Sequence, residues 1–425
     1  MLVVRYVDPR GEVTLNRRQA LGSTAGMIAA AALPWAVRAE DPKRKRLAAV
    51  NSAYFKLSHA YHIVGRLVYG YTVNGKHHQP PFQVVRQFNH QYHNEGRMQD
   101  LARPLAAKKG VAIAETIADA VGGPDVDGVL MIVEHGEYPR NDKNQILYPR
   151  AEFFQQIVDV FQKSKKSVPV FVDKHLSYDH VKARKMYDTA KAIGFPLMAG
   201  SSLPVTWRRP EWELPFGAGV VEAVVCFYAD LDIYDFHAME TLQCLMERRK
   251  GGESGVKSLT TLTGDAVWKA WDRGVWNKDL AEAALRRSAS RDYGTPRDHV
   301  EKPTAVLIEY ADGTRGTLLH LPGYVADITA AVKLKGDPKL HSTLFALPAP
   351  PGARFFDALT FQIEEFFATG KAPYPVERTL LTTTLHDFAM RSVADGGTVV
   401  SDPAMKVKYQ IPDKSWFFRG PFSDE

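Results

Sequence analysis

The chain has 425 residues, 45% of them hydrophobic and 24% charged, which is the composition of a soluble globular protein with two or three domains. The formal net charge is +6, but residues 1–39 carry five arginines against two acidic residues, so the remainder is too weakly basic to indicate a nucleic-acid-binding protein. The two cysteines, Cys226 and Cys244, lie in predicted core segments and indicate neither a zinc site nor a disulfide framework.

The first 39 residues have the pattern of an export signal. Arg17 and Arg18 precede an apolar run from Leu21 to Trp35, and small or modest residues follow as far as Ala39. A twin arginine in this position resembles a Tat signal, which exports folded proteins. The apolar run is shorter than the roughly 20 residues that a spanning helix needs. We therefore expect periplasmic or extracytoplasmic localisation and no stable membrane span after processing.

From residue 46 to 201 the sequence alternates between apolar runs and helical patterns. Continuous apolar runs are typical of strands buried on both faces of a parallel sheet, and alternation with helices predicts a doubly wound sheet. The segment 72–81 is rich in turn residues and predicts an exposed loop, and 135–150 predicts a long polar insertion. The predicted strands are 46–53, 82–88, 111–115, 127–134, 168–174 and 195–201, and the clearest helices are 96–110 and 180–194.

After about residue 206 the pattern changes to that of an α+β domain. The stretch 217–234 predicts a strand, and a helix is expected from Phe236 to Arg249. Asp312-Gly313 between two apolar runs predicts a hairpin. Two further helical patterns follow, the first closing on Gly370. The expected architecture is an open, mainly antiparallel sheet with helices on one face.

A short polar run ends the fifth predicted strand. In "VPVFVDKHLSY" four apolar residues and a proline lead into Asp173, Lys174 and His175. Ligands of open α/β sheets bind beyond the carboxyl ends of the strands, so these side chains are candidates for a site. A lysine there can donate to a substrate oxygen, and a nearby acid can hold it in place.

This layout resembles the glucose–fructose oxidoreductase/inositol dehydrogenase (Gfo/Idh/MocA) family, whose members carry an acid–lysine–proline motif after the fifth strand. The resemblance covers roughly residues 46–400 and includes "VDGVLMIV" and the closing helices "FQIEEFFATGKAPYPVERTLLTTTLHDFAMRSVADGGTV". It implies a Rossmann-like domain followed by an α+β domain, and an oxidoreductase that transfers hydride between a carbohydrate or polyol and a nicotinamide cofactor, NAD or NADP.

The sequence departs from the family pattern at three positions. The turn after the first strand lacks the glycine-rich phosphate loop and holds Tyr54, Phe55 and Lys56, so the backbone cannot approach a pyrophosphate as closely. His175 stands where the family has proline. The family's aspartate four residues before a catalytic histidine is replaced by Ile233 in front of His237, with Asp232 and Asp235 on either side. The turn is therefore expected to hold any nicotinamide further out, or not to hold one at all.

The resemblance assigns roles to individual residues. Lys174 is the expected general acid/base, His237 its partner and Asp173 the group that orients it. Because adjacent strand residues point to opposite faces, His237 or a carboxylate from "EHGEYP" is the alternative spatial partner of Lys174. Substrate contacts are expected from Lys174, His175, Trp207, Arg208, Tyr234 and His237, although Trp207 also suits interdomain packing. The predicted cofactor-binding residues are Asn51, Ser52, Ala53, Tyr54, Asn89, Glu134, His135 and Lys174. Asn89 is alternatively a surface turn residue.

Histidines follow several of the predicted strands and suggest a second hypothesis. His59, His62, His90, His93, His135 and His175 would face one edge of the sheet, with His237 opposite. Imidazole ligands suit a divalent metal. His90, His135 and His175 would then bind it in a sugar lyase, hydratase or epimerase. A third hypothesis is a non-catalytic carbohydrate-binding protein.

The predicted organisation is a Tat-like signal peptide at 1–39, a Rossmann-like dinucleotide-binding domain at 40–205, an α+β substrate and oligomerisation domain at 206–400, and a C-terminal tail at 401–425. The expected partner is a small-molecule carbohydrate, and no nucleic acid. Because the family often pairs through the open sheet of its second domain, a homo-oligomer is expected.

Overall fold

The computed structural model describes residues 44–229, 231–348 and 352–420. The predicted signal peptide, residues 1–39, lies outside the described residues. Within the described ranges, no helix combines the length and the apolar character that crossing a bilayer requires.

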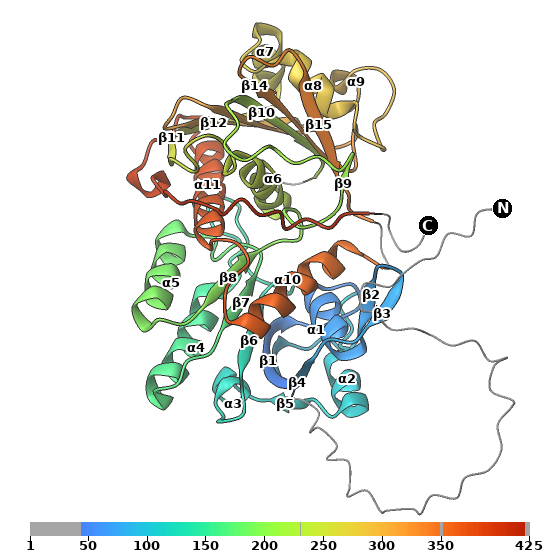
Figure 1. Cartoon of the computed structure of the whole chain (residues 1–425), viewed down its shortest axis with the longest axis vertical. Helices are drawn as coiled ribbons and strands as arrows, with labels where there is room; N and C mark the ends of the chain where they lie inside the picture. Colours follow the sequence, from blue (N-terminus) through green and yellow to red (C-terminus); the bar gives the residue numbers. More distant parts are fainter. Residues whose placement is uncertain (1–43, 230, 349–351, 421–425) are drawn as a thin grey trace, which may run out of the picture. The chain divides into compact units, whose positions relative to one another are not determined.

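The first sheet has six parallel strands in the order β5-β4-β1-β6-β7-β8, the doubly wound order of a Rossmann-like domain (Figure 1). All six predicted strands are confirmed, and β1, β6, β7 and β8 are buried along most of their length, whereas the edge strand β5 is largely exposed. The strands are β1 (Lys45–Ala53), β4 (Phe82–Gln91), β5 (Ala112–Ala114), β6 (Gly128–Ile132), β7 (Val170–Asp173) and β8 (Leu197–Gly200), and the helices are α1 (His59–Tyr69), α2 (Ala102–Lys109), α3 (Ile117–Val121), α4 (Arg150–Ser164) and α5 (His180–Ile193).

Two predictions for this half need correction. The segment expected to be a loop forms a small hairpin, β2 (Tyr71–Val73) and β3 (Lys76–His78), because Asn74 and Gly75 both adopt positive φ and make a tight turn. The helix expected over 96–110 begins only at Ala102. Residues 92–101 instead form a loop, and Asp100 accepts the backbone N–H of Ala102 at 2.8 Å.

The second sheet has seven strands in the order β11-β12-β13-β10-β14-β15-β9, and only the β10–β13 pair is parallel. The expected mainly antiparallel sheet and the hairpin at Asp312-Gly313 are confirmed. The strands are β9 (Arg208–Arg209), β10 (Val220–Phe227), β11 (Val256–Thr263), β12 (Thr304–Tyr310), β13 (Arg315–His320), β14 (Ile328–Leu334) and β15 (Leu340–Phe345).

Helices cover both faces of this sheet, so the prediction of helices on one face is wrong. Alternate residues of β10 enter two separate cores: Val225 packs with α6, whereas Val224 packs with α8 around Trp276. The homo-oligomer expected from pairing through this sheet stays a prediction. The helices are α6 (Leu231–Met246), α7 (Asp265–Arg273), α8 (Lys278–Leu285), α9 (Pro296–His299), α10 (Phe355–Thr369), α11 (Glu377–Ala394) and the 3₁₀ helix η1 (Pro403–Met405).

The chain returns to the first sheet through α10, which lies beside α1 (Figure 1). Arg66 of α1 donates to Asp357 of α10 at 2.6 Å, and both side chains are largely buried. The last described segment contacts the chain near Val205, since the Phe418 backbone N–H donates to the Val205 carbonyl at 2.9 Å. α10 therefore brings aromatic residues from the end of the sequence to the carboxyl edge of the first sheet. Both cysteines are free and buried, as expected.

Candidate functional site

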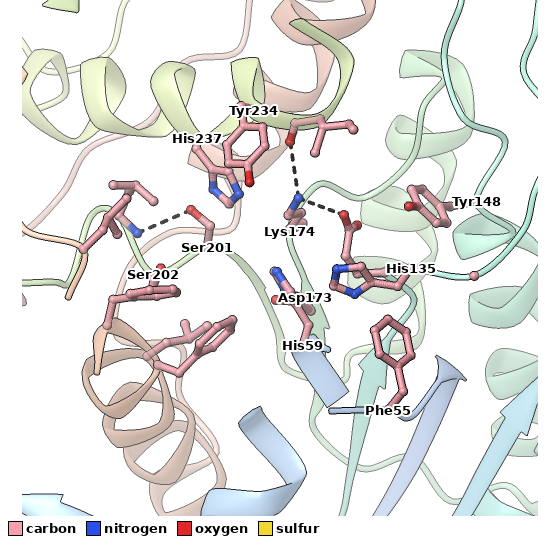
Figure 2. A pocket seen from close by; sticks show the side chains of 18 of the residues that line it. Phe55, His59, His135, Tyr148, Asp173, Lys174, Ser201, Ser202, Tyr234 and His237 are labelled. Carbon is pink, nitrogen blue, oxygen red and sulfur yellow. Dashed lines mark hydrogen bonds and ion pairs between the residues drawn. The ribbon is translucent and has the colours of Figure 1, made fainter. Parts of the chain in front are cut away.

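A cavity of about 750 Å³ lies at the carboxyl edge of the first sheet, where α6 and α10 close over it. Figure 2 shows side chains from several elements around this space. Six of the predicted site residues line it: Glu134, His135, Asp173, Lys174, Tyr234 and His237. Its volume is that of an ordinary ligand pocket.

Lys174 is held by a buried carboxylate of the segment "EHGEYP", which the sequence offered as the alternative to Asp173. Its Nζ donates to Glu134 Oε1 at 2.8 Å and to the backbone carbonyl of Ile233 at 3.3 Å. Glu134 also pairs with the fully buried Arg150. Burial opposes ionisation of Glu134, but the charges of Lys174 and Arg150 hold its pKa well below its usual range.

The prediction that Asp173 orients Lys174 is wrong. Adjacent strand residues point to opposite faces of a sheet. Asp173 Oδ2 instead lies 2.6 Å from His59 Nδ1, at the start of α1, and the Asp173 side chain is buried.

Two residues that line the cavity have a left-handed backbone conformation. Lys174, directly after β7, has φ +63°, and His135, three residues after the end of β6, has φ +71°. A left-handed conformation is uncommon for residues other than glycine, and such outliers gather at functional sites. The backbone at Lys174 is fixed because its N–H donates to the Gly200 carbonyl at 3.1 Å. The two side chains are thereby turned into the cavity (Figure 2).

Several polar atoms of the cavity wall are buried without a hydrogen-bond partner among the described residues: His93 Nε2, His135 Nδ1, Asp173 Oδ1 and His237 Nδ1. Burial is the main reason why the pKa of His135 falls to about 4 and that of His237 falls well below the usual range. Both imidazoles are therefore neutral near pH 7. Unpartnered buried polar groups are costly, and their concentration in one cavity indicates a polar ligand.

The turn after β1 is closed by bulky residues. β1 pairs on both sides as far as Asn51, so Asn51, Ser52 and Ala53 stay inside the sheet instead of facing the cavity. Tyr54 is buried too, and its carbonyl accepts from the N–H of Leu101 in the loop after β4. The first side chain of the turn to reach the cavity is Phe55.

Asn89 is neither a surface turn residue nor a residue of the cavity wall. β4 extends to Gln91, so Asn89 is buried opposite Asn51 and accepts from its side-chain amide at 3.1 Å. The four predicted cofactor contacts from 51 to 54 and Asn89 thus lie behind the surface that lines the cavity.

Trp207 and Arg208 are likewise away from the cavity. Trp207 packs edge-on against Phe418 and is buried. Arg208 is 2% exposed, in β9, with its guanidinium over Phe345 and Phe417. Both residues belong to the packing of the second sheet, and their prediction as substrate contacts is wrong.

His175 turns away from the cavity into the interior. Arg150 contacts its ring, and His386 of α11 stacks on it with ring centroids 5.5 Å apart. His90 stacks on Tyr138 with centroids 5.9 Å apart, on the outer side of the loop. The three-histidine metal hypothesis is therefore wrong, and no group of three or more potential metal ligands occurs in the part of the chain that the structure describes.

The aspartates around His237 serve the helix interface. Asp235 lies 3.1 Å from His320 Nε2 and 3.2 Å from His386 Nδ1, whereas Asp232 accepts from Arg140. Burial opposes protonation of His386, but hydrogen bonds with Asp232 and Asp235 outweigh it and raise the pKa of His386 to about 9.

Sequence reasoning missed part of the cavity wall. Phe356 comes from α10 and contacts the His59 ring edge-on, with centroids 4.9 Å apart. Ser201 and Ser202 follow β8 and also line the cavity. The sequence signal that could have identified them is the presence of small polar side chains directly after a strand. Nothing in the local sequence near 356 indicated a site.

In sequence, no family model and no curated protein matches the chain. In structure, it is similar to GenD2 from gentamicin A biosynthesis in complex with NAD, with a TM-score of 0.53 at 13% identity over 89% of this chain and 99% of that one. It is also similar to the Lactobacillus casei myo-inositol dehydrogenase in complex with NAD(H) and myo-inositol (TM-score 0.52, 12% identity, 87% and 98% covered). A third similar structure is myo-inositol 2-dehydrogenase from Lactobacillus plantarum, with a TM-score of 0.50 at 12% identity over 84% of this chain and 99% of that one. The expected resemblance to Gfo/Idh/MocA-type dehydrogenases is confirmed at the level of the fold.

Proposed function

We propose that the protein is an oxidoreductase that interconverts a hydroxyl and a carbonyl group of a carbohydrate or polyol with a nicotinamide cofactor. The observation that carries this proposal is the cavity itself: a buried lysine, fixed by a carboxylate, stands among unpartnered polar atoms at the carboxyl edge of a Rossmann-like sheet. Structural neighbours crystallised with NAD, one of them also with myo-inositol, support both the cofactor and the substrate class.

The cavity fits the nicotinamide end of such a cofactor. Glu134, His135 and Lys174 would hold it at the ends of β6 and β7. The phosphates cannot enter the closed turn after β1. An adjoining hollow of about 440 Å³ shares Phe55 and His135 with the cavity, and the exposed cations Lys56 and Arg97 line it. These two cations would hold the phosphates outside the turn.

When bound, the nicotinamide supplies the hydride acceptor or donor. Lys174 places an ammonium group on the reacting oxygen, since it has three N–H donors and two are directed to Glu134 and to the Ile233 carbonyl. His237 and Tyr234, from α6, face the same space across the cavity (Figure 2). α6 and α10 limit the access of water, which strengthens each electrostatic contact.

The test is formation of reduced nicotinamide when the protein is incubated with NAD or NADP and a panel of polyols and sugars that includes myo-inositol. Saturable formation with at least one substrate is expected, and it should be lost in Lys174→Met. Polyol binding without any nicotinamide binding would instead identify a carbohydrate-binding protein.

We also propose that the protein is exported by a Tat-type route, supported by Arg17, Arg18 and the apolar run after them. Residues 1–45 fused to a reporter should direct it across the membrane. Replacing both arginines by lysine should block this export, and a wholly cytoplasmic wild-type fusion would contradict the proposal.

A further inference from the structure

A histidine–carboxylate pair stands in the cavity beside the lysine. His59 is the first residue of α1, whose N-cap Ser58 accepts from the Tyr61 N–H and so fixes the start of the helix. Asp173 is the last residue of β7. Although 114 positions separate them, His59 Nδ1 and Asp173 Oδ2 are 2.6 Å apart. His59 follows the turn after β1, whereas Asp173 comes from the end of a different strand.

The contact fixes which nitrogen of the imidazole is basic. A carboxylate only accepts hydrogen bonds, so the neutral ring carries its hydrogen on Nδ1 and its lone pair on Nε2. No described residue bonds Nε2, and this atom is not among the fully buried unpartnered ones. The His59 side chain is 17% exposed and lines the cavity. Its lone pair is therefore open to a ligand.

The position of the ring is also fixed from both sides. The His135 ring meets it edge-on with centroids 5.2 Å apart, and Phe356 meets it edge-on at 4.9 Å. A proton acceptor must keep one orientation to act efficiently, and these contacts supply it. Among the histidines of the described cavity wall, only His59 has a carboxylate partner.

Lys174 suits a different task. Its ammonium group has three N–H donors and no lone pair. Two of the donors already bond to Glu134 and to the Ile233 carbonyl. Such a group stabilises negative charge on an oxygen. A reaction that removes a proton from a hydroxyl needs an acceptor as well, and the cavity offers His59 Nε2.

We propose that His59 is the proton acceptor for the substrate hydroxyl, that Asp173 positions it, and that Lys174 stabilises the resulting alkoxide; this rests on the proposed function in that the ligand carries a hydroxyl. The O–H bond breaks, an N–H bond forms at Nε2, and the electron pair stays on oxygen. Asp173 offsets the charge of the imidazolium.

The first test needs no substrate. Long-range ¹⁵N–¹H correlation spectra of the full chain report the tautomer of each histidine, and carbethoxylation by diethyl pyrocarbonate, mapped by peptide mass spectrometry, reports the reactive lone pair. His59 should show the Nδ1–H tautomer and fast modification at Nε2. Asp173→Asn should alter the tautomer and slow the modification. An Nε2–H tautomer, or an unreactive His59, would overturn the inference.

The second test uses turnover of whichever polyol supports nicotinamide reduction. His59→Asn keeps an N–H for Asp173 but removes the acceptor, so kcat should fall about 100-fold or more, with unchanged calorimetric affinity for NAD. The acidic limb of the pH profile of kcat/KM should also disappear. The control is His78→Asn, which breaks a histidine–carboxylate pair with Glu364 (2.8 Å). His78 does not line the cavity, so kcat and the acidic limb of the pH profile should stay unchanged.

Retention of the acidic limb and of most of kcat in His59→Asn would refute the proton-transfer role. If no polyol supports turnover, the tautomer and modification results still decide whether the pair exists as described. In that case it is the proposed function that fails, and not the geometry of the pair.

Discussion

Replacing Glu134 by glutamine tests the charge arrangement that fixes Lys174. The carboxylate is 5% exposed and lies between two buried cations: Lys174, 4% exposed, and Arg150, 0% exposed. Glu134→Gln keeps the shape of the side chain but leaves both cations without a counter-charge. Removing one partner from a buried ion pair costs about 3–5 kcal/mol, because the charge that remains is desolvated and unpaired. We expect a loss of this size in the free energy of unfolding.

The assay is urea denaturation followed by circular dichroism, with Glu152→Gln as the matched control. Glu152 accepts from Lys182 at 2.6 Å but is about half exposed, so its loss should change the free energy of unfolding by less than about 0.5 kcal/mol. Lys174→Met should cost less than Glu134→Gln, since Glu134 keeps Arg150. A loss below about 1 kcal/mol in Glu134→Gln would refute a buried charge network at this site.

Three further predictions follow from the site. Lys174→Met should keep the fold while turnover falls by about 100-fold or more. Lys174→Arg should fail almost as badly, because a planar guanidinium does not fit the contacts that the ammonium makes with Glu134 and the Ile233 carbonyl; wild-type-like turnover in either variant would contradict the role of Lys174. The pKa of His386 is raised from 6.5 to about 9, so protonation of His386 stabilises the folded state by about 3 kcal/mol. This contribution should be fully present below pH 6.5 and lost as the pH rises through 9. The free energy of unfolding in urea should show this loss in the wild type and not in His386→Gln. Lys56→Ala and Arg97→Ala should each weaken NAD binding about tenfold in calorimetry, whereas exposed Lys76→Ala should not; equal affinity in all three would show that the phosphates lie elsewhere.

Much of the fold could be predicted because buried parallel strands read as unbroken apolar runs. All six strands of the first sheet were recognised in this way, although their order in the sheet was not predicted. The helices on the second face of the other sheet were missed because the patterns of 265–285 do not indicate which face they cover. The start of α6 was also placed late, since Asp232 was assigned to the preceding strand, which ends already at Phe227. Asp232 and Asp235 lie in α6 and are buried partners of other elements.

The site could be predicted only where residues stand at the end of a strand. Glu134, His135 and Lys174 were found in this way, because a strand end determines which edge of the sheet a side chain reaches. The prediction of Asn51 as a cofactor contact was wrong for the converse reason: β1 continues past Asn51, so this residue does not stand at the end of its strand. The partner of Asp173 could not be predicted, because His59 reaches it through the packing of α1 and not through any local pattern.

Direct calorimetric titration of the full chain with NAD, and separately with NADP, tests the central claim that the cavity binds a nicotinamide outside a closed turn. We expect saturable one-to-one binding of at least one cofactor with a dissociation constant above about 1 µM, equivalent to a binding free energy weaker than about −8 kcal/mol. A submicromolar constant would show that the bulky turn at Phe55 does not hinder the phosphates. No binding of either cofactor up to about 1 mM would contradict the claim itself.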